Sequence, residues 1–203
     1  MVFTSHFFIF YFLPAVLAVY YALPRSTAWR NAWLLVASYF FYGWWNPWFV
    51  CLILGVSAIN YACGRVMAAR GASERRRQAA AVAAVTISLG LLVLFKYAGF
   101  LQVNANRLLA LAGLPGVRVW EIVLPVGISF YTFQALSYAV DVYRRDAPPA
   151  RSFSDFACYI ALFPQMIAGP IVRYGAVVQQ LRVREYRPER FATGVALFIM
   201  GFA

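Results

Sequence analysis

Residues that could take part in chemistry are few in this sequence, and they gather in one stretch. The segment FPQMIAGPIVRY (163–174) places an amide and a guanidinium among apolar residues and interrupts them with proline and glycine. A straight helix cannot pass through two prolines so placed, because each removes a backbone donor and clashes with the preceding turn. We therefore expect the candidates for lining a substrate channel here, and they are Pro164, Gln165, Gly169, Pro170 and Arg173.

The interrupted backbone has two interpretations at this point. Non-helical backbone at membrane depth survives only where protein or a water-filled cavity surrounds it, so the segment either shapes a cavity or is a structural helix kinked by proline. Gln165 either satisfies the freed backbone groups or lines a polar channel. Arg173 meets either lipid phosphate or an anionic ligand such as a nucleotide-like carrier.

Other chemical groups are isolated from one another. The only histidine is His6, at the start of the first apolar segment, and Asp141 is followed by Arg144 and Arg145 at the spacing of a local helical ion pair. No two groups are placed to act as general acid and general base. The three cysteines show no metal-ligand spacing. We expect no catalytic residue, no metal site and no bound cofactor in this chain.

Composition predicts the class of protein that must position these residues. Apolar residues make up 63% of the chain, charged residues 12%, and the mean hydropathy is +0.67. Soluble domains are usually about 45–50% apolar and about 25% charged. The sequence therefore predicts an all-α, polytopic integral membrane protein. The net charge of +11 comes from arginines between apolar segments, which contact anionic lipid headgroups, so we expect membrane lipid as a partner and no nucleic acid.

Apolar runs predict the membrane segments as one domain. We expect them at about 6–23, 29–45, 48–64, 79–96, 123–143 and 153–172, with another starting near 191. Residues 98–121 predict an amphipathic surface helix that ends at Gly113 and Pro115. The loop from Arg65 to Arg77 holds five arginines, so it is expected to be cytoplasmic, which places the N-terminus outside.

The sixth segment does not fit a simple alternation. A full crossing would place Arg173, Arg182, Arg184, Arg187 and Arg190 outside. A segment that turns back between Pro164 and Pro170 would keep them cytoplasmic. Re-entry is the favoured alternative, because the residues that break the helix also permit the turn.

Five strings in order resemble one family. They are MVFTSHFFIFYFLPAVLAVYY at the start, ASYFFYGWWNPWF (37–49), FKYAGF (95–100), LPVGISFYTFQALSYAVDVYR (124–144) and LFPQMIAGPIVRY (162–174). Together they resemble the membrane-bound O-acyltransferase superfamily, and within it the bacterial alginate O-acetyltransferase branch. The resemblance extends over essentially the whole chain.

That resemblance implies a fold and a function. Family members form a thick ring of helices, thinned at the centre, in which donor and acceptor meet from opposite faces of the membrane. The implied reaction transfers an acetyl group, from acetyl-CoA or another cytoplasmic donor, to a hydroxyl of an exported polysaccharide, alginate or a similar one. A periplasmic protein that relays the acetyl group is an alternative acceptor. The implied location is the bacterial inner membrane.

The chain also departs from the family. The family's histidine, in an apolar Trp-His-Gly context, does not occur here, and the sequence stops within an apolar run. We therefore expect an N-terminal fragment of the domain, inactive by itself. The alternative is a non-enzymatic membrane scaffold or conduit, or a truncated inactive gene product. A transporter is less favoured, because no matching pair of broken helices suggests an inverted repeat.

Overall fold

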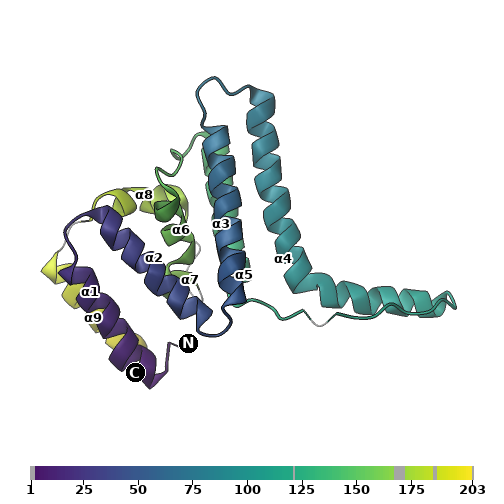
Figure 1. Ribbon diagram of the computed structural model, residues 1–203, viewed down its shortest axis with the longest axis horizontal. Coiled ribbons are helices and arrows are strands. Elements are labelled where there is room, and N and C mark those ends of the chain that lie inside the picture. The colour runs from purple at the N-terminus through teal and green to yellow at the C-terminus, as the bar shows by residue number, and fades with distance from the viewer. Residues whose placement is uncertain (1–2, 121, 167–171, 185–186, 203) are drawn as a thin grey trace.

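The computed structural model describes residues 3–120, 122–166, 172–184 and 187–202, and every regular element within them is helical, which confirms the all-α class. Figure 1 shows two groups of helices and a projecting arm. In chain order the elements are the π-helix η1 (Phe8–Phe12), α1 (Leu13–Ala22), α2 (Thr27–Gly43), α3 (Trp48–Met67), α4 (Glu74–Leu111), α5 (Ile128–Arg144), α6 (Phe153–Ala161), α7 (Phe163–Met166), α8 (Tyr174–Arg182) and α9 (Pro188–Phe202).

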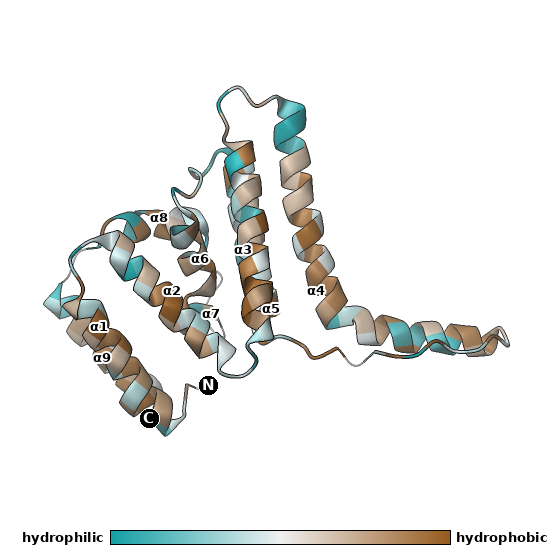
Figure 2. Cartoon of the chain, in the orientation of Figure 1, coloured by the Kyte–Doolittle hydropathy of each residue, from teal (hydrophilic) through white to brown (hydrophobic). Residues whose placement is uncertain are grey.

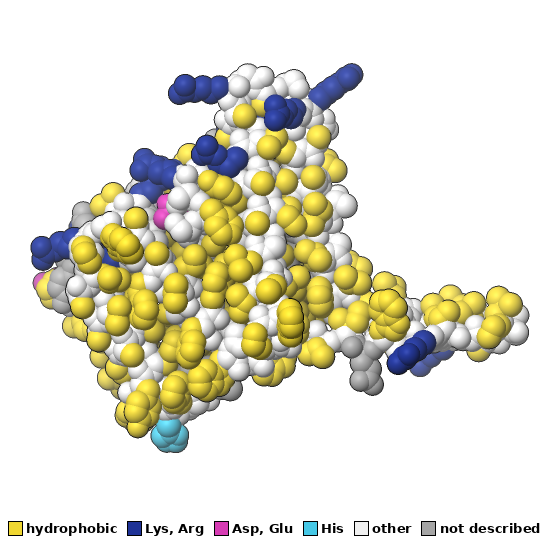
Figure 3. Space-filling model, viewed as in Figure 1, with side chains coloured by type: hydrophobic (Ala, Val, Ile, Leu, Met, Phe, Trp, Pro, Cys, Tyr) yellow, Lys and Arg dark blue, Asp and Glu magenta, His cyan; other side chains and the backbone are white. Residues whose placement is uncertain are grey.

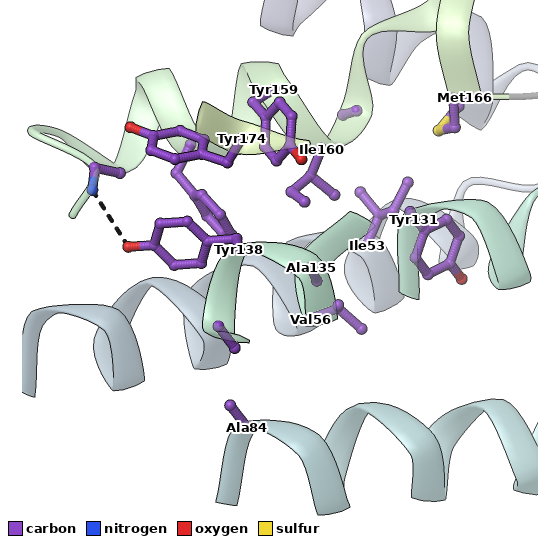
Figure 4. Packing of buried hydrophobic residues seen from close by; sticks show 14 of the residues in the cluster. Ile53, Val56, Ala84, Tyr131, Ala135, Tyr138, Tyr159, Ile160, Met166 and Tyr174 are labelled. Atoms are coloured by element: carbon purple, nitrogen blue, oxygen red, sulfur yellow. Dashed lines mark hydrogen bonds between the residues drawn. The ribbon is translucent and has the colours of Figure 1, made fainter. Parts of the chain in front are cut away.

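Helices α3, α4 and α5 pack as a bundle around the larger of two apolar cores. Ile53 and Val56 of α3, Ala84 of α4, and Tyr131 and Tyr138 of α5 are all fully or almost fully buried in it (Figure 4). In the part of the chain that the structure describes, two helices, α3 and α4, are long and apolar enough to cross a membrane. The bundle thus supplies two helices of membrane-spanning length.

A close approach brings α3 against α5. A Cβ atom added at Gly64 would lie 2.7 Å from ring atoms of Tyr138, so only glycine leaves room for the phenol. The Tyr138 hydroxyl in turn accepts a hydrogen bond from the backbone N–H of Ala150, 3.3 Å away (Figure 4). The two helices are therefore held at a separation that a side chain at position 64 would not permit.

Arg77 joins three helices at one end of this bundle. Its Nε donates to the Met67 carbonyl at the end of α3 (3.2 Å), and its Nη2 donates to the Tyr143 carbonyl near the end of α5 (2.6 Å). Its Nη1 pairs with Glu74 in the first turn of α4 at 2.8 Å. A cation at helix C-termini is stabilising, because it satisfies carbonyls that have no partner in their own helix.

The helices at the start of the chain, η1, α1 and α2, form an aromatic core of their own together with α7. Phe8 and Phe12 of η1 and Phe41 of α2 are buried together with Phe163 from α7. The Phe163 ring lies 5.4–6.1 Å from the other three rings, centroid to centroid. The start of the proline-containing segment is therefore anchored between the first helices of the chain.

Most of the expected segments correspond to helices with some shifted bounds, whereas 153–172 divides into α6 and α7, and its residues 167–171 lie outside the described part of the chain. Pro125 and Gly127 delay the fifth helix, which begins at Ile128 instead of residue 123. The expected surface helix within 98–121 is the distal part of α4, and it ends at Leu111. Gly113, with φ of +72°, ends it in a Schellman motif in which the N–H of Leu114 reaches the carbonyl of Leu109 at 2.9 Å.

The prediction that Asp141 forms an ion pair with Arg144 or Arg145 is wrong. Arg144 instead pairs with Asp146, its Nε lying 3.5 Å from the Asp146 carboxylate, while Asp141 is buried in α5. The reason is the end of the helix: Arg145 adopts a left-handed conformation with φ of +66°, and the chain turns back there. The turn brings the carboxylate of Asp146, just beyond the helix, to the arginine.

The surface divides into an apolar body and a basic end. Figure 2 shows apolar residues along all the long helices, and Figure 3 shows apolar side chains over most of the visible face. Lysine and arginine gather over the α3–α4 connection and around α8. Large exposed apolar surfaces mark contact with lipid or protein.

Candidate functional site

A cavity lined by arginine lies beside α8. It measures about 880 Å³ and is bounded by the end of α6, by α7, by α8 with the two residues after it, and by the start of α9. No carboxylate contributes to its lining among the residues that the structure describes. Four arginines and three glutamines do, and they are Arg151, Arg182, Arg184, Arg190, Gln165, Gln179 and Gln180. Such a cavity favours an anionic group, since guanidinium donors match phosphate and carboxylate.

A buried amide fixes one wall of this cavity. Asn31, near the start of α2, is fully buried, and its Nδ2 donates both to the Asp155 carboxylate at 2.7 Å and to the Leu181 carbonyl at 2.9 Å. Its Oδ1 accepts from Arg184 Nη2 at 2.6 Å. Asparagine alone among the side chains of this size offers two donors and an acceptor on one planar group. The start of α6, the end of α8 and Arg184 therefore all meet at one side chain.

Tyr20 holds the other side of Arg184. Arg184 Nη1 donates to the Tyr20 hydroxyl at 3.1 Å, and its guanidinium carbon lies 5.7 Å from the centre of the Tyr20 ring. The guanidinium of Arg30, a buried residue of α2, lies 5.0 Å from the same ring. Two cations thus share one aromatic ring, an arrangement that concentrates positive charge close to the cavity.

The remaining cavity arginines lie closer to the surface of the molecule. Arg151 and Arg190 are exposed and Arg182 is half-buried. The two ion pairs found within the described residues, Arg77–Glu74 and Arg144–Asp146, involve none of them. A cavity lined by several guanidinium groups raises the local concentration of anions.

The turn that precedes α5 packs against α7 in the proline-containing segment. Gly127 has φ of +75°, and a Cβ atom there would lie 2.7 Å from the Met166 carbonyl oxygen. The Tyr42 hydroxyl donates to the neighbouring Val126 carbonyl at 2.9 Å. The glycine is therefore required twice, by its backbone conformation and by the close approach of α7.

Tyr159 connects the cavity to the far end of the proline segment. It lines the cavity, and its hydroxyl donates to the Val172 carbonyl at 2.8 Å. Its own carbonyl accepts from Gln134 Nε2 of α5 at 3.0 Å. In Figure 4 the Tyr159 ring lies next to Tyr174, and their centroids are 5.2 Å apart. The cavity wall is thereby joined to the central helix bundle.

The residues predicted to line a substrate channel do not all lie at the cavity. Gln165 lines the cavity, whereas its neighbour Pro164 is exposed in the first turn of α7 and does not. Arg173 is exposed at the N-cap of α8, outside the cavity lining. Gly169 and Pro170 lie outside the described residues.

Sequence reasoning missed most of this site. Arg182, Arg184 and Arg190 were considered only for topology, and Asn31 and Asp155 were not considered at all. A signal for Asn31 existed in its position, because a neutral amide one turn inside an apolar helix needs a buried partner. Its partners lie 124 and 150 positions later, at a distance along the chain that no local pattern reveals.

The fold and the site together define a helical protein with an apolar exterior and an anion-accepting cavity. No protein-family model matches the chain, and no solved structure matches it significantly. Several curated proteins do match. The chain is 41% identical over 202 residues to the "Probable alginate O-acetylase AlgI" of Pseudomonas aeruginosa and also 41% identical to that of Azotobacter vinelandii, over all of its own length and 38% and 40% of theirs.

A more distant relative is also named as an O-acetylating enzyme. The peptidoglycan O-acetyltransferase of Helicobacter pylori is 28% identical, over 99% of this chain and 43% of that protein. The resemblance to the alginate O-acetyltransferase branch is therefore confirmed. The chain spans about two fifths of the length of these relatives, as expected for part of a longer domain.

Proposed function

We propose that this chain is the donor-side part of a bacterial membrane O-acetyltransferase. The enzyme would take an acetyl group from acetyl-CoA or another cytoplasmic donor and transfer it to a hydroxyl of an exported polysaccharide, alginate or a similar polymer. The observation that carries the proposal is the arginine-lined cavity in a chain that is similar, along its whole length, to proteins named as O-acetylases.

In this proposal the cavity holds the anionic part of the donor. A phosphate-bearing carrier would contact Arg151, Arg182 and Arg190, while Asn31 and Tyr20 hold Arg184 in place. In the transfer, the acetyl carbon loses its bond to the donor and gains a bond to the acceptor oxygen, whose proton must go to a base. We assign that base to residues outside this chain, so residues 1–203 alone are predicted to be inactive.

The proposed topology is multi-pass, with the basic end in the cytoplasm and the N-terminus outside. The arginines around α8 then share a side of the membrane with the α3–α4 loop, so the stretch from α6 to α8 would be re-entrant. Support comes from Asn31, which binds both the start of α6 and the end of α8. Single cysteines placed at Arg182 and at Arg75 test this, because both must be labelled from the cytoplasmic side. Labelling of the first from the periplasmic side would contradict re-entry.

Polymer acetylation tests the function. The open reading frame that contains this chain should restore O-acetyl groups to alginate exported by a strain that lacks its own acetylase. Changing Arg182 and Arg190 together to glutamine should lower acetylation several-fold, whereas changing Arg75 and Arg76 should not. A stable protein that restores no acetylation would contradict the proposal and favour a scaffold or conduit.

Donor binding tests the cavity by itself. Purified residues 1–203 in detergent should bind coenzyme A, and the affinity should fall with added salt because the attraction is electrostatic. The Arg182→Gln, Arg190→Gln double variant should bind more weakly by an order of magnitude. Equal binding by this variant would exclude the cavity as the donor site.

A further inference from the structure

A projecting arm has amide side chains between its two halves and apolar side chains on its outside. We use the name arm for residues 96–120, which comprise the distal part of α4 and the chain that returns beside it (Figure 1). The last buried residue of α4 is Leu92, so the arm lies beyond the helical core. Figure 1 shows the distal part of α4 turning sharply away from the axis of its first part.

Amide side chains hold the two halves of the arm together. Asn106 Nδ2 donates to the Val117 carbonyl at 2.8 Å, and its Oδ1 accepts from the Val117 N–H at 2.7 Å. Gln102 Oε1 accepts from the Trp120 N–H at 2.7 Å. The helix thus satisfies backbone groups of the extended segment, as a neighbouring strand would. Such pairing matters most in an apolar medium, where an unpaired backbone group is costly.

Apolar side chains cover the outside of the same unit. Phe100 and Leu108 are 67% and 68% exposed, Leu111 is 86% exposed, and Trp120 is 70% exposed. A helix in water would turn its amides outward and its leucines inward. The inverted arrangement indicates that the arm's surroundings are apolar.

The charge of the arm favours lipid over protein as its surroundings. The arm carries Lys96, Arg107 and Arg118 and has no acidic residue from 96 to 120. All three cations are exposed. Such cations beside an apolar face match lipid phosphates, and tryptophan favours the same level of the bilayer. A protein partner of this face would be expected to carry carboxylates opposite these cations.

We propose that the arm lies flat within the headgroup region of the membrane, at the end of the bundle opposite the α3–α4 loop. Its apolar side faces the acyl chains, and Lys96, Arg107 and Arg118 contact lipid phosphates. The arm would fix the depth at which α3, α4 and α5 sit in the bilayer. This inference does not depend on acetyl transfer and concerns a part of the molecule separate from the cavity.

Spin labels test the depth of the arm. Cys51 and Cys63 are replaced by alanine, while the fully buried Cys158 stays. Labels at Leu108, at Leu111 and, as an aqueous reference, at Ala69 of the α3–α4 loop are compared in phosphatidylcholine vesicles. The labels on the arm should collide several-fold more often with oxygen, which concentrates in lipid, than with a water-soluble nickel chelate. The label at Ala69 should collide more often with the nickel chelate. The proposal would be overturned if the arm labels were as accessible to the nickel chelate as the label at Ala69 is. It would also be overturned if neither reagent reached the arm labels, because protein would then cover the arm.

Lipid charge supplies the second measurement. Adding an equal amount of phosphatidylglycerol should move the Leu108 label deeper, and the Lys96→Gln, Arg107→Gln, Arg118→Gln variant should lose that shift. The matched control changes Arg70, Arg75 and Arg76, at the other end of the bundle, and should keep it. An unchanged label depth in the native arm would exclude attraction of these cations to anionic headgroups and would overturn their part in the proposal.

Discussion

Asn31 donates a hydrogen bond of 2.7 Å to the carboxylate of Asp155, which lies 124 positions later in the chain. The same nitrogen binds the carbonyl of Leu181, and the amide oxygen binds Arg184. One neutral amide thus holds α2 against α6 and α8 and fixes the position of Arg184 at the cavity. Both its neutrality and its planar shape are needed, because it stands between an anion and a cation.

Changing Asn31 to aspartate should break this arrangement. Arg184 can still bind the new carboxylate, but the donor group becomes a carboxylate oxygen that repels Asp155 and leaves the Leu181 carbonyl without its donor, which costs about 1–3 kcal/mol. We expect a loss of that order in the free energy of unfolding, measured by denaturant titration in detergent micelles, together with weaker coenzyme A binding. Asn104→Asp is the control, since Asn104 donates only to the Phe100 carbonyl in its own helix. Equal effects of the two substitutions would contradict the role of Asn31.

Alanine at Gly127 should be strongly destabilising. The left-handed conformation costs a non-glycine residue about 1–2 kcal/mol, and the added Cβ would collide with the Met166 carbonyl, a backbone atom that cannot rotate away. Gly90→Ala is the matched control, because nothing lies within 4 Å of its Cβ position. That change should stabilise the helix by about 0.5–1 kcal/mol. Opposite signs in thermal unfolding are the expected result.

A side chain at Gly64 should force α3 and α5 apart. Gly64→Ala meets the Tyr138 ring, and overpacking of this kind costs about 1–3 kcal/mol. Gly55→Ala on the same helix meets nothing and should be neutral or stabilising. Tyr138→Phe removes the hydroxyl, which is the nearest contact, so it should recover part of the loss in the double variant. Additive effects of the two changes would show that the added Cβ atom and the Tyr138 hydroxyl do not collide.

Loss of Arg77 should loosen one end of the bundle. Arg77→Ala leaves the carbonyls of Met67 and Tyr143 without this donor, which should lower the free energy of unfolding by about 2 kcal/mol. Its neighbour in sequence, Arg76, is exposed, and Arg76→Ala should change stability by no more than about 0.5 kcal/mol. Hydrogen exchange should localise the effect of Arg77→Ala to the ends of α3 and α5.

Composition and local pattern determined the class of this protein and the approximate places of its helices. Apolar runs of helical length, glycine and proline at their ends, and arginine between them are properties of neighbouring residues. A sequence therefore displays them directly. The end of α4 just before Gly113 follows from the same kind of information, because a glycine ends a helix through its own backbone conformation.

Tertiary structure alone decided which arginines form a site. By pattern Arg77 is one of five arginines in a loop, yet it is buried among three helices, while Arg182, Arg184 and Arg190 gather around one cavity. Gln165 joins that cavity and Arg173 does not, although both stand in the same short stretch of sequence. The reason is that the direction of a side chain depends on how distant helices pack. The hydrogen bonds that fix this packing, from Asn31 to Asp155 and Leu181, connect residues that no local spacing relates.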